Sequence, residues 1–249
     1  MVERLDGVFK SISDFLRQEL NGKNAVIGVS SGIDSALVLT ILSKAIDKDR
    51  IHAFFMPDRF TRSADFDDIR SLEGSTGVKI NEINIENIVN GYKSTLGIKD
   101  KKYEGNIRSR VRSVILYYNA NLLNGLVVGT TNRTEYLIGY FTKYGDSACD
   151  LEPIEHLYKS DVRELASYLK VPESIIRKKP SAGLWSDQYD EDELGMGYEE
   201  LDSILKDLFE KKTGILDDRY KMVYDMYIRS QHKRKLPKSM MNDDFRYNV

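Results

Sequence analysis

The sequence predicts an α/β fold in which a doubly wound, mainly parallel sheet is followed by additional C-terminal helices. Three observations lead to this fold class. Short apolar runs recur between residues 25 and 130 and are separated by segments of helical periodicity, which is typical of parallel strands joined by crossover helices. The first run leads directly into a turn of small residues before a helix. After residue 150, helical stretches and loops replace the alternation.

The expected elements follow in chain order. Apolar side chains at helical spacing predict a first helix over 2–20. The expected strands are 25–30, 51–57, 78–85 and 125–130, and the further helices are 35–46, 106–123, 160–169, 198–211 and 217–231. Loops longer than about 12–15 residues are uncommon unless they are functional or disordered, which draws attention to 57–67 with its flanks and to 178–193. We expect 1–249 to form a single domain.

Composition narrows the class of protein. The chain has 249 residues, a formal net charge of -2 and a pI of about 6.0, which disfavours attraction of its whole surface to nucleic acid or to an anionic membrane. Its one cysteine, Cys149, excludes an internal disulfide framework. The charged N-terminal stretch contains no long apolar run, so we expect no signal peptide or membrane span and a cytoplasmic location.

The clearest chemical signal is GVSSGIDSA over 28–36, between a buried strand and a helix. Small side chains let backbone N–H groups approach phosphate oxygens, and the helix N-terminus adds partial positive charge. Asp34 could hold a cation beside the phosphates. The alternative is a tight turn in which Asp34 and Ser35 only cap the helix. The expected phosphate-binding residues are Gly28, Val29, Ser30, Ser31, Gly32, Ile33, Asp34 and Ser35.

This loop is neither a Walker-type GxxxxGK[ST] nor a dinucleotide GxGxxG. It resembles the SGGxDS loop of the N-type ATP pyrophosphatases, with Ser31 where that pattern usually has its first glycine. The resemblance implies a Rossmann-like fold of the adenine nucleotide alpha hydrolase type. It also implies cleavage of ATP between the α and β phosphates, which leaves AMP on the substrate.

A second, longer signal runs from Gly129 to Leu165, GTTNRTEYLIGYFTKYGDSACDLEPIEHLYKSDVREL. It lies at the carboxyl end of the fourth expected strand, where open α/β sheets bind ligands. This segment resembles the NAD synthetases, and the resemblance extends through KPSAGLW and HKR over most of the chain. It implies the last step of NAD biosynthesis, in which ATP activates deamido-NAD as an acyl-adenylate that ammonia converts to NAD, with release of AMP and pyrophosphate.

The same resemblance assigns roles around the triphosphate. Asp34 and Glu135 are expected to hold Mg²⁺, a hard cation that prefers oxygen ligands. Lys159 is expected to contact the ATP phosphates, and Thr130 and Ser181 to contact ATP. Taken alone, Glu135 would be interpreted as an acid in the first turn of a helix, and Lys159 as a surface residue before a helix.

The residues expected to bind deamido-NAD are Arg110, Lys143, Asp150, His232 and Lys233. Of the arginines in NIRSRVR, Arg110 falls at the rim of an apolar helix stripe, where a partly sheltered guanidinium could bind a ligand. Arg108 and Arg112 are interpreted as a solvated face. Asp146 is as well explained as a turn former. The basic cluster 232–235 would otherwise be a solvated or phosphate-binding tail.

Loop 178–193 is interpreted as a lid that excludes water from the adenylate, with Leu184 and Trp185 as apolar contacts. The alternative is a disordered linker. Gly183 stands where the family usually has aspartate, so no carboxylate role is assigned there. His52 and His156 are interpreted as structural or surface residues, and Cys149 as non-catalytic.

The expected partners are ATP, deamido-NAD and ammonia. The phosphate loop begins within thirty residues of the first residue, which leaves no room upstream for an amidase domain, so ammonia is the direct substrate unless a separate glutaminase subunit delivers it. Family resemblance implies a homodimer, with Tyr117 and Tyr118 as interface candidates. Rival interpretations are another ATP pyrophosphatase, such as a GMP synthetase subunit or a tRNA-modifying adenylase, and a nucleic-acid-binding module using the basic segments. We expect neither nucleic acid nor membrane as a partner.

Overall fold

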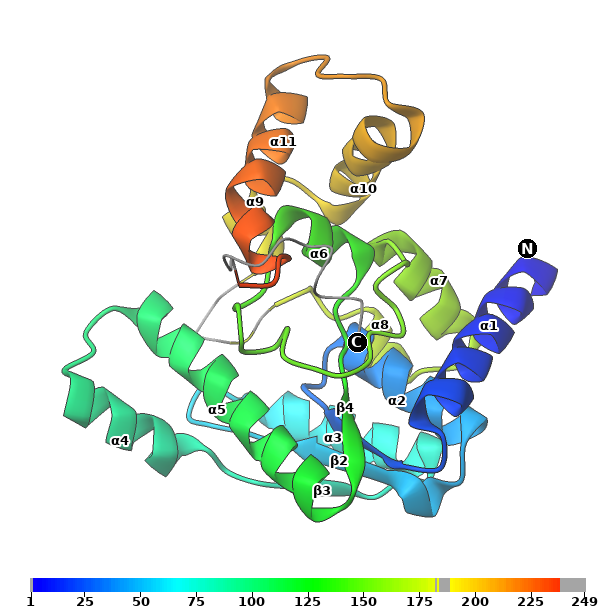
Figure 1. Cartoon of the computed structure of the whole chain (residues 1–249), viewed down its shortest axis with the longest axis vertical. Helices are drawn as coiled ribbons and strands as arrows, with labels where there is room; N and C mark the ends of the chain where they lie inside the picture. The colour runs from blue at the N-terminus through cyan, green and yellow to red at the C-terminus, as the bar shows by residue number, and fades with distance from the viewer. Residues whose placement is uncertain (1, 182, 184–188, 238–249) are drawn as a thin grey trace.

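The computed structural model describes residues 2–181, 183 and 189–237, and its centre is a four-stranded parallel sheet in the order β3-β2-β1-β4. The strands are β1 Asn24–Gly28, β2 Ile51–Phe55, β3 Ile80–Glu82 and β4 Gly125–Val128. β1 lies in the middle, where Ala25 pairs with Ile51 of β2 and with Leu126 of β4. Because every strand points the same way, their carboxyl ends meet at one edge of the sheet (Figure 1).

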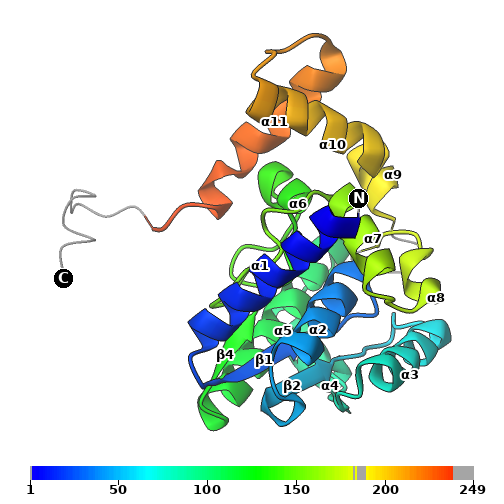
Figure 2. The same cartoon turned by 90° about the vertical axis from the view of Figure 1, so that its right-hand side faces the viewer.

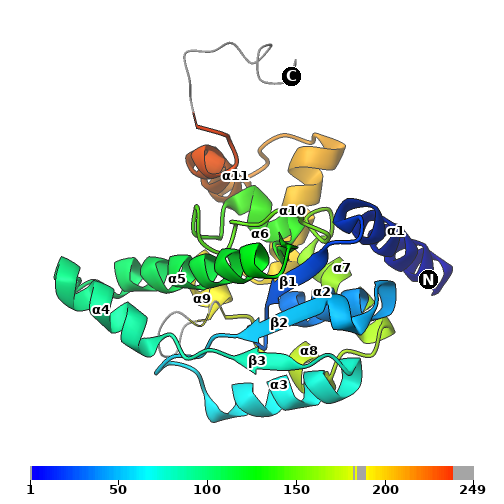
Figure 3. The same cartoon turned by 60° about the horizontal axis from the view of Figure 1, so that its bottom comes forward.

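Helices cover both faces of this sheet, as Figure 3 shows, which confirms the predicted fold class. On one face lie α1 Val2–Leu20, α2 Ile33–Ala45, α3 Ser63–Thr76, α7 Lys159–Tyr168 and α8 Glu173–Ile176. On the other lie α4 Glu86–Leu96 and α5 Lys101–Leu122. Alternate strand residues serve the two layers: Ala25 and Ile27 join the core beneath α1 and α2, whereas Val26 joins the core beneath α5.

The remaining helices form a separate cluster beyond the carboxyl edge of the sheet. They are α6 Arg133–Ile138, α9 Asp190–Leu194, α10 Tyr198–Lys206 with a π-helical turn Asp207–Lys211, and α11 Asp218–Ser230. Their own apolar cluster includes Tyr198, Leu205 and Val223. α10 and α11 extend as a hairpin away from the sheet (Figure 2). The predicted additional C-terminal helices are therefore confirmed.

Some boundaries differ from the expectation. The expected loop 57–67 is shorter, because α3 begins at Ser63 with the Asp65 carboxylate accepting the Arg62 backbone N–H. The expected strand 78–85 is reduced to β3, and α4 was not expected at all. Leu184 and Trp185, together with most of the segment 182–188, lie outside the described residues. Within the described part of the chain, no helix combines the length and apolar character that crossing a bilayer requires.

Candidate active site

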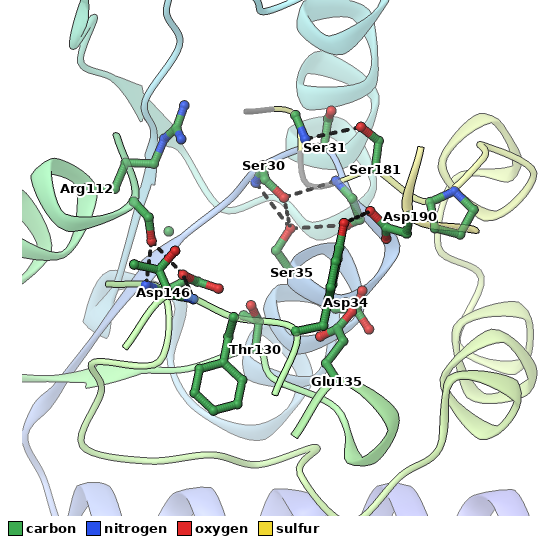
Figure 4. Close-up of a pocket in the computed structure, with 18 of the residues that line it drawn as sticks. Ser30, Ser31, Asp34, Ser35, Arg112, Thr130, Glu135, Asp146, Ser181 and Asp190 are labelled. Carbon is green, nitrogen blue, oxygen red and sulfur yellow. Dashed lines mark hydrogen bonds between the residues drawn. The ribbon is translucent and has the colours of Figure 1, made fainter. Parts of the chain in front are cut away.

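A pocket of about 1070 Å³ opens at the carboxyl edge of the sheet (Figure 4). All eight residues of the phosphate loop, 28–35, line it. Thr130 after β4, Ser181 after α8 and Lys233 after α11 line it from other directions. The expected ATP-binding residues therefore surround one cavity, and its volume suits a nucleotide.

Serine side chains hold the phosphate loop in its turn. The Ser30 backbone N–H donates to Ser35 Oγ at 3.2 Å, and the Gly32 N–H donates to Ser30 Oγ at 3.3 Å. Ser35 Oγ in turn donates to the Gly32 carbonyl at 3.1 Å, within the first turn of α2. Ser31 is buried and has a left-handed backbone with φ of 61°. The glycine of the related pattern fits this conformation most easily, which explains the usual residue at the position.

A buried lysine joins the two carboxylates expected to hold a metal. Lys159 Nζ donates to Asp34 Oδ2 at 2.6 Å and to Glu135 Oε1 at 3.0 Å. Its side chain is 3% exposed, so the interpretation of Lys159 as a surface residue is wrong. Asn132 Nδ2 donates to the other Asp34 oxygen at 2.8 Å. Residues from α2, α6 and α7 thus converge on one point beside the phosphate loop. Figure 4 shows Asp34 and Glu135 at this point.

Glu135 also caps its helix. Its backbone N–H donates to Asn132 Oδ1 at 3.0 Å, and its Oε2 accepts the Asn132 N–H at 3.5 Å. The capping interpretation and the site interpretation are therefore compatible, because each uses a different carboxylate oxygen. Burial raises the pKa of Glu135 above its usual value; Lys159 opposes that rise and the nearby Asp34 adds to it. Burial alone would lower the pKa of Lys159, but the Asp34 and Glu135 carboxylates raise it above its usual value.

The donor set at this point fits magnesium bound to a nucleotide. Asp34 and Glu135 each present a carboxylate to the pocket, and both reach the same Lys159 Nζ. Among the described residues no group of three histidine, cysteine, aspartate or glutamate side chains could hold a metal ion. Two protein carboxylates, with phosphate oxygens and water completing the coordination shell, is an arrangement that Mg²⁺ commonly adopts.

Four of the five residues expected to bind deamido-NAD lie along one rim. Arg110 Nη2 donates to the Lys143 carbonyl at 3.3 Å, and Lys143 Nζ donates to the His232 carbonyl at 2.7 Å. Lys233 Nζ donates to the carbonyls of Gly139 and Phe141, each at 2.7 Å. Burial lowers the pKa of Lys233. The rim is therefore cationic and reaches the pocket at Lys233, whereas Arg110, Lys143 and His232 do not line the pocket.

Asp150 lies apart from this rim. One of its carboxylate oxygens accepts the Val127 backbone N–H at 2.7 Å, and the other accepts the Tyr117 hydroxyl at 3.3 Å. It is exposed at the β4 edge and does not line the pocket. Within one chain, the structure does not bring Asp150 to the other expected deamido-NAD residues.

Comparison with known proteins identifies the family. The model of the family described as NAD synthase matches residues 8–237. The chain belongs to the NAD synthase family. Relatives from Picrophilus torridus (99% identical, covering all of both chains) and Thermoplasma acidophilum (55% identical, covering 92% of this chain and 95% of the relative) are both named NH(3)-dependent NAD(+) synthetase. The resemblance inferred from the two sequence signals is thereby confirmed.

Solved structures that resemble this chain have the same fold. The NMN synthetase of Francisella tularensis superposes with a TM-score of 0.85 at 32% identity, covering 94% of this chain and 98% of that one. The NH3-dependent NAD synthetase of Campylobacter jejuni, solved with a nitrate ion, gives a TM-score of 0.82 at 29% identity and covers 95% and 99% of the two chains. The parallel sheet and its helices are thus a shared NAD synthase architecture.

The arginines of α5 are placed differently from the expectation. Arg108 is 1% exposed, and it donates to Asp58 Oδ2 at 2.7 Å and to Glu104 Oε1 at 2.5 Å. Arg112 donates to the Met56 carbonyl at 3.1 Å and lines the pocket. Arg110 is exposed. The interpretation of Arg108 and Arg112 as a solvated face is therefore wrong, as is the partly sheltered setting expected for Arg110.

The physical reason lies in the loop after β2. This loop brings Asp58 against α5, and its carboxylate together with Glu104 offsets the cost of removing a guanidinium from water. Burial alone would raise the pKa of Glu104, but hydrogen bonds from Lys93 and Arg108 lower it below its usual value. The Asp58–Arg108 pair spans fifty positions, so helix periodicity within α5 could not reveal it.

Several polar groups near the site were not singled out from the sequence. The Tyr198 hydroxyl donates to Asp190 Oδ2 at 2.9 Å, and the Tyr198 ring centroid lies 5.1 Å from Lys159 Nζ. Tyr140 donates to the other Asp190 oxygen at 3.1 Å. These contacts join α9 and α10 to α7, and a single sequence carries no signal for them because each partner looks like an ordinary helix or turn residue.

The remaining residues weighed from the sequence have local partners. Asp146 Oδ1 accepts the Thr142 N–H at 2.9 Å, which confirms its role in the turn. Asp146 also lines the pocket. Cys149 Sγ donates to Glu152 at 3.2 Å, and burial raises the pKa of the thiol above its usual value. A thiol with a raised pKa is a poor nucleophile, in agreement with a non-catalytic Cys149. His52 and His156 do not line the pocket.

Proposed function

We propose that this chain catalyses the ammonia-dependent conversion of deamido-NAD to NAD, at the expense of ATP. The observation that carries the proposal is the convergence of Asp34, Glu135 and Lys159 beside a phosphate-binding turn. The names of the relatives at 99% and 55% identity support the same activity. The cationic side chains of Arg110, Lys143 and Lys233 along this rim support a second anionic substrate next to ATP.

The proposed mechanism proceeds through an acyl-adenylate. An oxygen of the nicotinate carboxylate forms a bond to the α-phosphorus of ATP as the bond to the β-phosphate breaks, which releases pyrophosphate. Ammonia then attacks the acyl carbon, AMP leaves with the former carboxylate oxygen, and a proton is lost from the nitrogen. Positioning and electrostatics supply the catalysis, since no covalent bond to the protein is needed.

The chain's own residues stabilise the charge that moves in the first step. Asp34 and Glu135 would hold magnesium, which supplies positive charge to the phosphate oxygens. Lys159 adds an ammonium beside them, and the amides of the phosphate loop other than those of Ser30 and Gly32, which donate within the turn, can donate to the departing pyrophosphate. Thr130 and Ser181 line the same cavity and are proposed to contact ATP.

Product analysis tests the reaction class. With ATP, Mg²⁺ and ammonium present, deamido-NAD is expected to drive release of AMP and pyrophosphate in equal amounts, and EDTA to abolish that release until Mg²⁺ is restored. The assay is repeated with nicotinate mononucleotide, because a structural relative is an NMN synthetase, and with XMP. Formation of ADP, or AMP release driven by XMP or by the mononucleotide rather than by deamido-NAD, would contradict the proposal. Replacing ammonium with glutamine should leave the purified chain inactive.

We also propose that the chain acts as a homodimer through the outer face of α5. Val114, Tyr118 and Leu122 recur at four-residue spacing on that helix and are 66%, 65% and 68% exposed. β4 is an edge strand packed against α5, and Tyr117 and Asp150 lie at the same edge. Apolar groups in such a continuous stripe are typical of an interface between subunits.

A charge placed in this stripe is expected to separate the subunits. Tyr118→Glu should convert a dimer to a monomer in light scattering coupled to gel filtration, because two carboxylates would meet across an apolar contact. Val2→Glu is the matched control, since Val2 is similarly exposed on α1, which packs against the opposite face of the sheet. A wild-type chain that is already monomeric would contradict this proposal.

Three further expectations stay predictions: the single domain over 1–249, the lid role of 178–193 and the cytoplasmic location.

A further inference from the structure

The left-handed turn at Ser31 needs support from outside the phosphate loop. A residue with a Cβ atom is strained at a φ of 61°, and the serine bonds within the loop involve Ser30, Gly32 and Ser35 rather than Ser31. Ser31 is nevertheless 1% exposed and forms part of the pocket wall. Another part of the molecule must therefore stabilise this conformation.

The support comes from Lys178, which lies two residues after the end of α8. Lys178 Nζ donates to Ser31 Oγ at 2.8 Å and lies 3.4 Å from the Ser31 carbonyl oxygen. Its other partners are two carboxylates of α3, Asp65 Oδ1 at 2.5 Å and Asp68 Oδ2 at 2.8 Å. The Ser31 hydroxyl donates to the same Asp65 oxygen at 3.1 Å. The three donor positions of the ammonium are thus directed to three side chains.

Helices on either side fix the position of this ammonium. Asp65 accepts the Arg62 backbone N–H at 2.9 Å at the start of α3, and Asp68 accepts the Ser174 hydroxyl of α8 at 2.7 Å. Burial alone would raise the pKa of Asp65, but hydrogen bonds from Lys178 and Arg62 lower it. The Lys178 side chain is only 19% exposed, so its contacts are shielded from bulk water.

We propose that Lys178 is a positioning residue for the phosphate loop: through Ser31 it holds the turn in the conformation that receives the pyrophosphate part of ATP. The hydroxyl at position 31 gives this chain a contact that glycine could not make. The inference rests on the proposed function for its relevance to turnover. Its physical content, an organised pyrophosphate site, is independent of the second substrate.

Binding and kinetics together test the inference. The probe is inorganic pyrophosphate with Mg²⁺, titrated calorimetrically into wild type, Lys178→Met, Ser31→Gly and the double variant. Lys178→Met should weaken pyrophosphate binding and raise KM for ATP by about tenfold, the value of one charged hydrogen bond, while KM for deamido-NAD stays within about twofold. In the Ser31→Gly background the same lysine substitution should have a smaller effect, because the shared contact is already lost. Arg177→Met is the control, since its exposed guanidinium pairs only with Glu173 among the ion pairs of that helix.

Three results would overturn the inference. The first is unchanged pyrophosphate affinity in a folded Lys178→Met protein. The second is a double variant whose loss of affinity equals the product of the losses in the two single variants, which would mean that Lys178 and Ser31 act independently. The third concerns stability. A melting curve is measured for each variant, and an equal rise of both KM values with a lowered Tm would assign Lys178 a purely structural role. A wild-type protein that binds pyrophosphate but fails to amidate deamido-NAD would contradict the proposed function while leaving this inference intact.

Discussion

Replacing Lys159 with methionine is expected to lower kcat/KM for the conversion of deamido-NAD to NAD by about 10²–10³-fold, as loss of one preorganised charged donor typically does. The substitution also leaves the Asp34 and Glu135 carboxylates without the ammonium that both contact. Breaking a buried pair in this way costs about 3–5 kcal/mol of unfolding free energy. Steady-state kinetics and urea denaturation measure the two effects separately.

A second substitution distinguishes catalysis from folding. Adding Asp34→Asn to Lys159→Met removes one of the unpaired charges and should recover part of the stability, without recovering activity. Lys206→Met is the control, because its ammonium lies 4.7 Å from the centroid of the Tyr158 ring and forms no ion pair with Asp34 or Glu135. Wild-type turnover in a stable Lys159→Met protein would refute the role given to this residue.

Two arginines of α5 are expected to have different roles: Arg108 in stability and Arg110 in substrate binding. Arg108→Met should destabilise the protein by about 3 kcal/mol, because buried Asp58 would keep only Arg112, at 3.7 Å, and Glu104 would lose one of its three cationic partners. Arg110→Met, two positions along the same helix, should change the unfolding free energy by no more than about 0.5 kcal/mol, as exposed substitutions usually do.

For substrate binding we expect the opposite ranking, with the larger effect at Arg110. Arg110→Met is expected to raise KM for deamido-NAD, since its guanidinium belongs to the cationic rim with Lys143. It should leave KM for ATP near the wild-type value. Chemical denaturation midpoints measure the stability of both variants, and the KM values for ATP and deamido-NAD measure their substrate binding. If Arg108→Met proves as stable as Arg110→Met, the buried pairs contribute less than the structure implies.

The strands and the phosphate loop could be predicted because their signals are local. Ala25, Ile27 and Val26 carry an uninterrupted apolar run, which is what a strand covered on both faces requires. The small residues after Gly28 announce a tight turn before a helix. Asp34 and Glu135 were placed at one site through a family pattern, and the structure gives them a common partner in Lys159.

What could not be predicted depends on contacts between distant segments. Helix periodicity placed Arg108 on a polar side, and nothing in its own helix indicated that Asp58 would cover that side. The same holds for Ser31, whose departure from glycine becomes intelligible only when Asp65 and Lys178 are seen beside it. α3 itself was missed because its weak apolar pattern begins among charged residues.

The pairing of Lys159 with both carboxylates bears on the order in which ligands arrive. A free divalent ion entering the site would find two carboxylates whose charge one ammonium already balances in part, and it would have few other ligands. A nucleotide that carries the ion brings most of the coordination shell with it and gives the ammonium new anions to face. The enzyme should therefore discriminate against bare magnesium and recruit the metal–nucleotide complex as a unit.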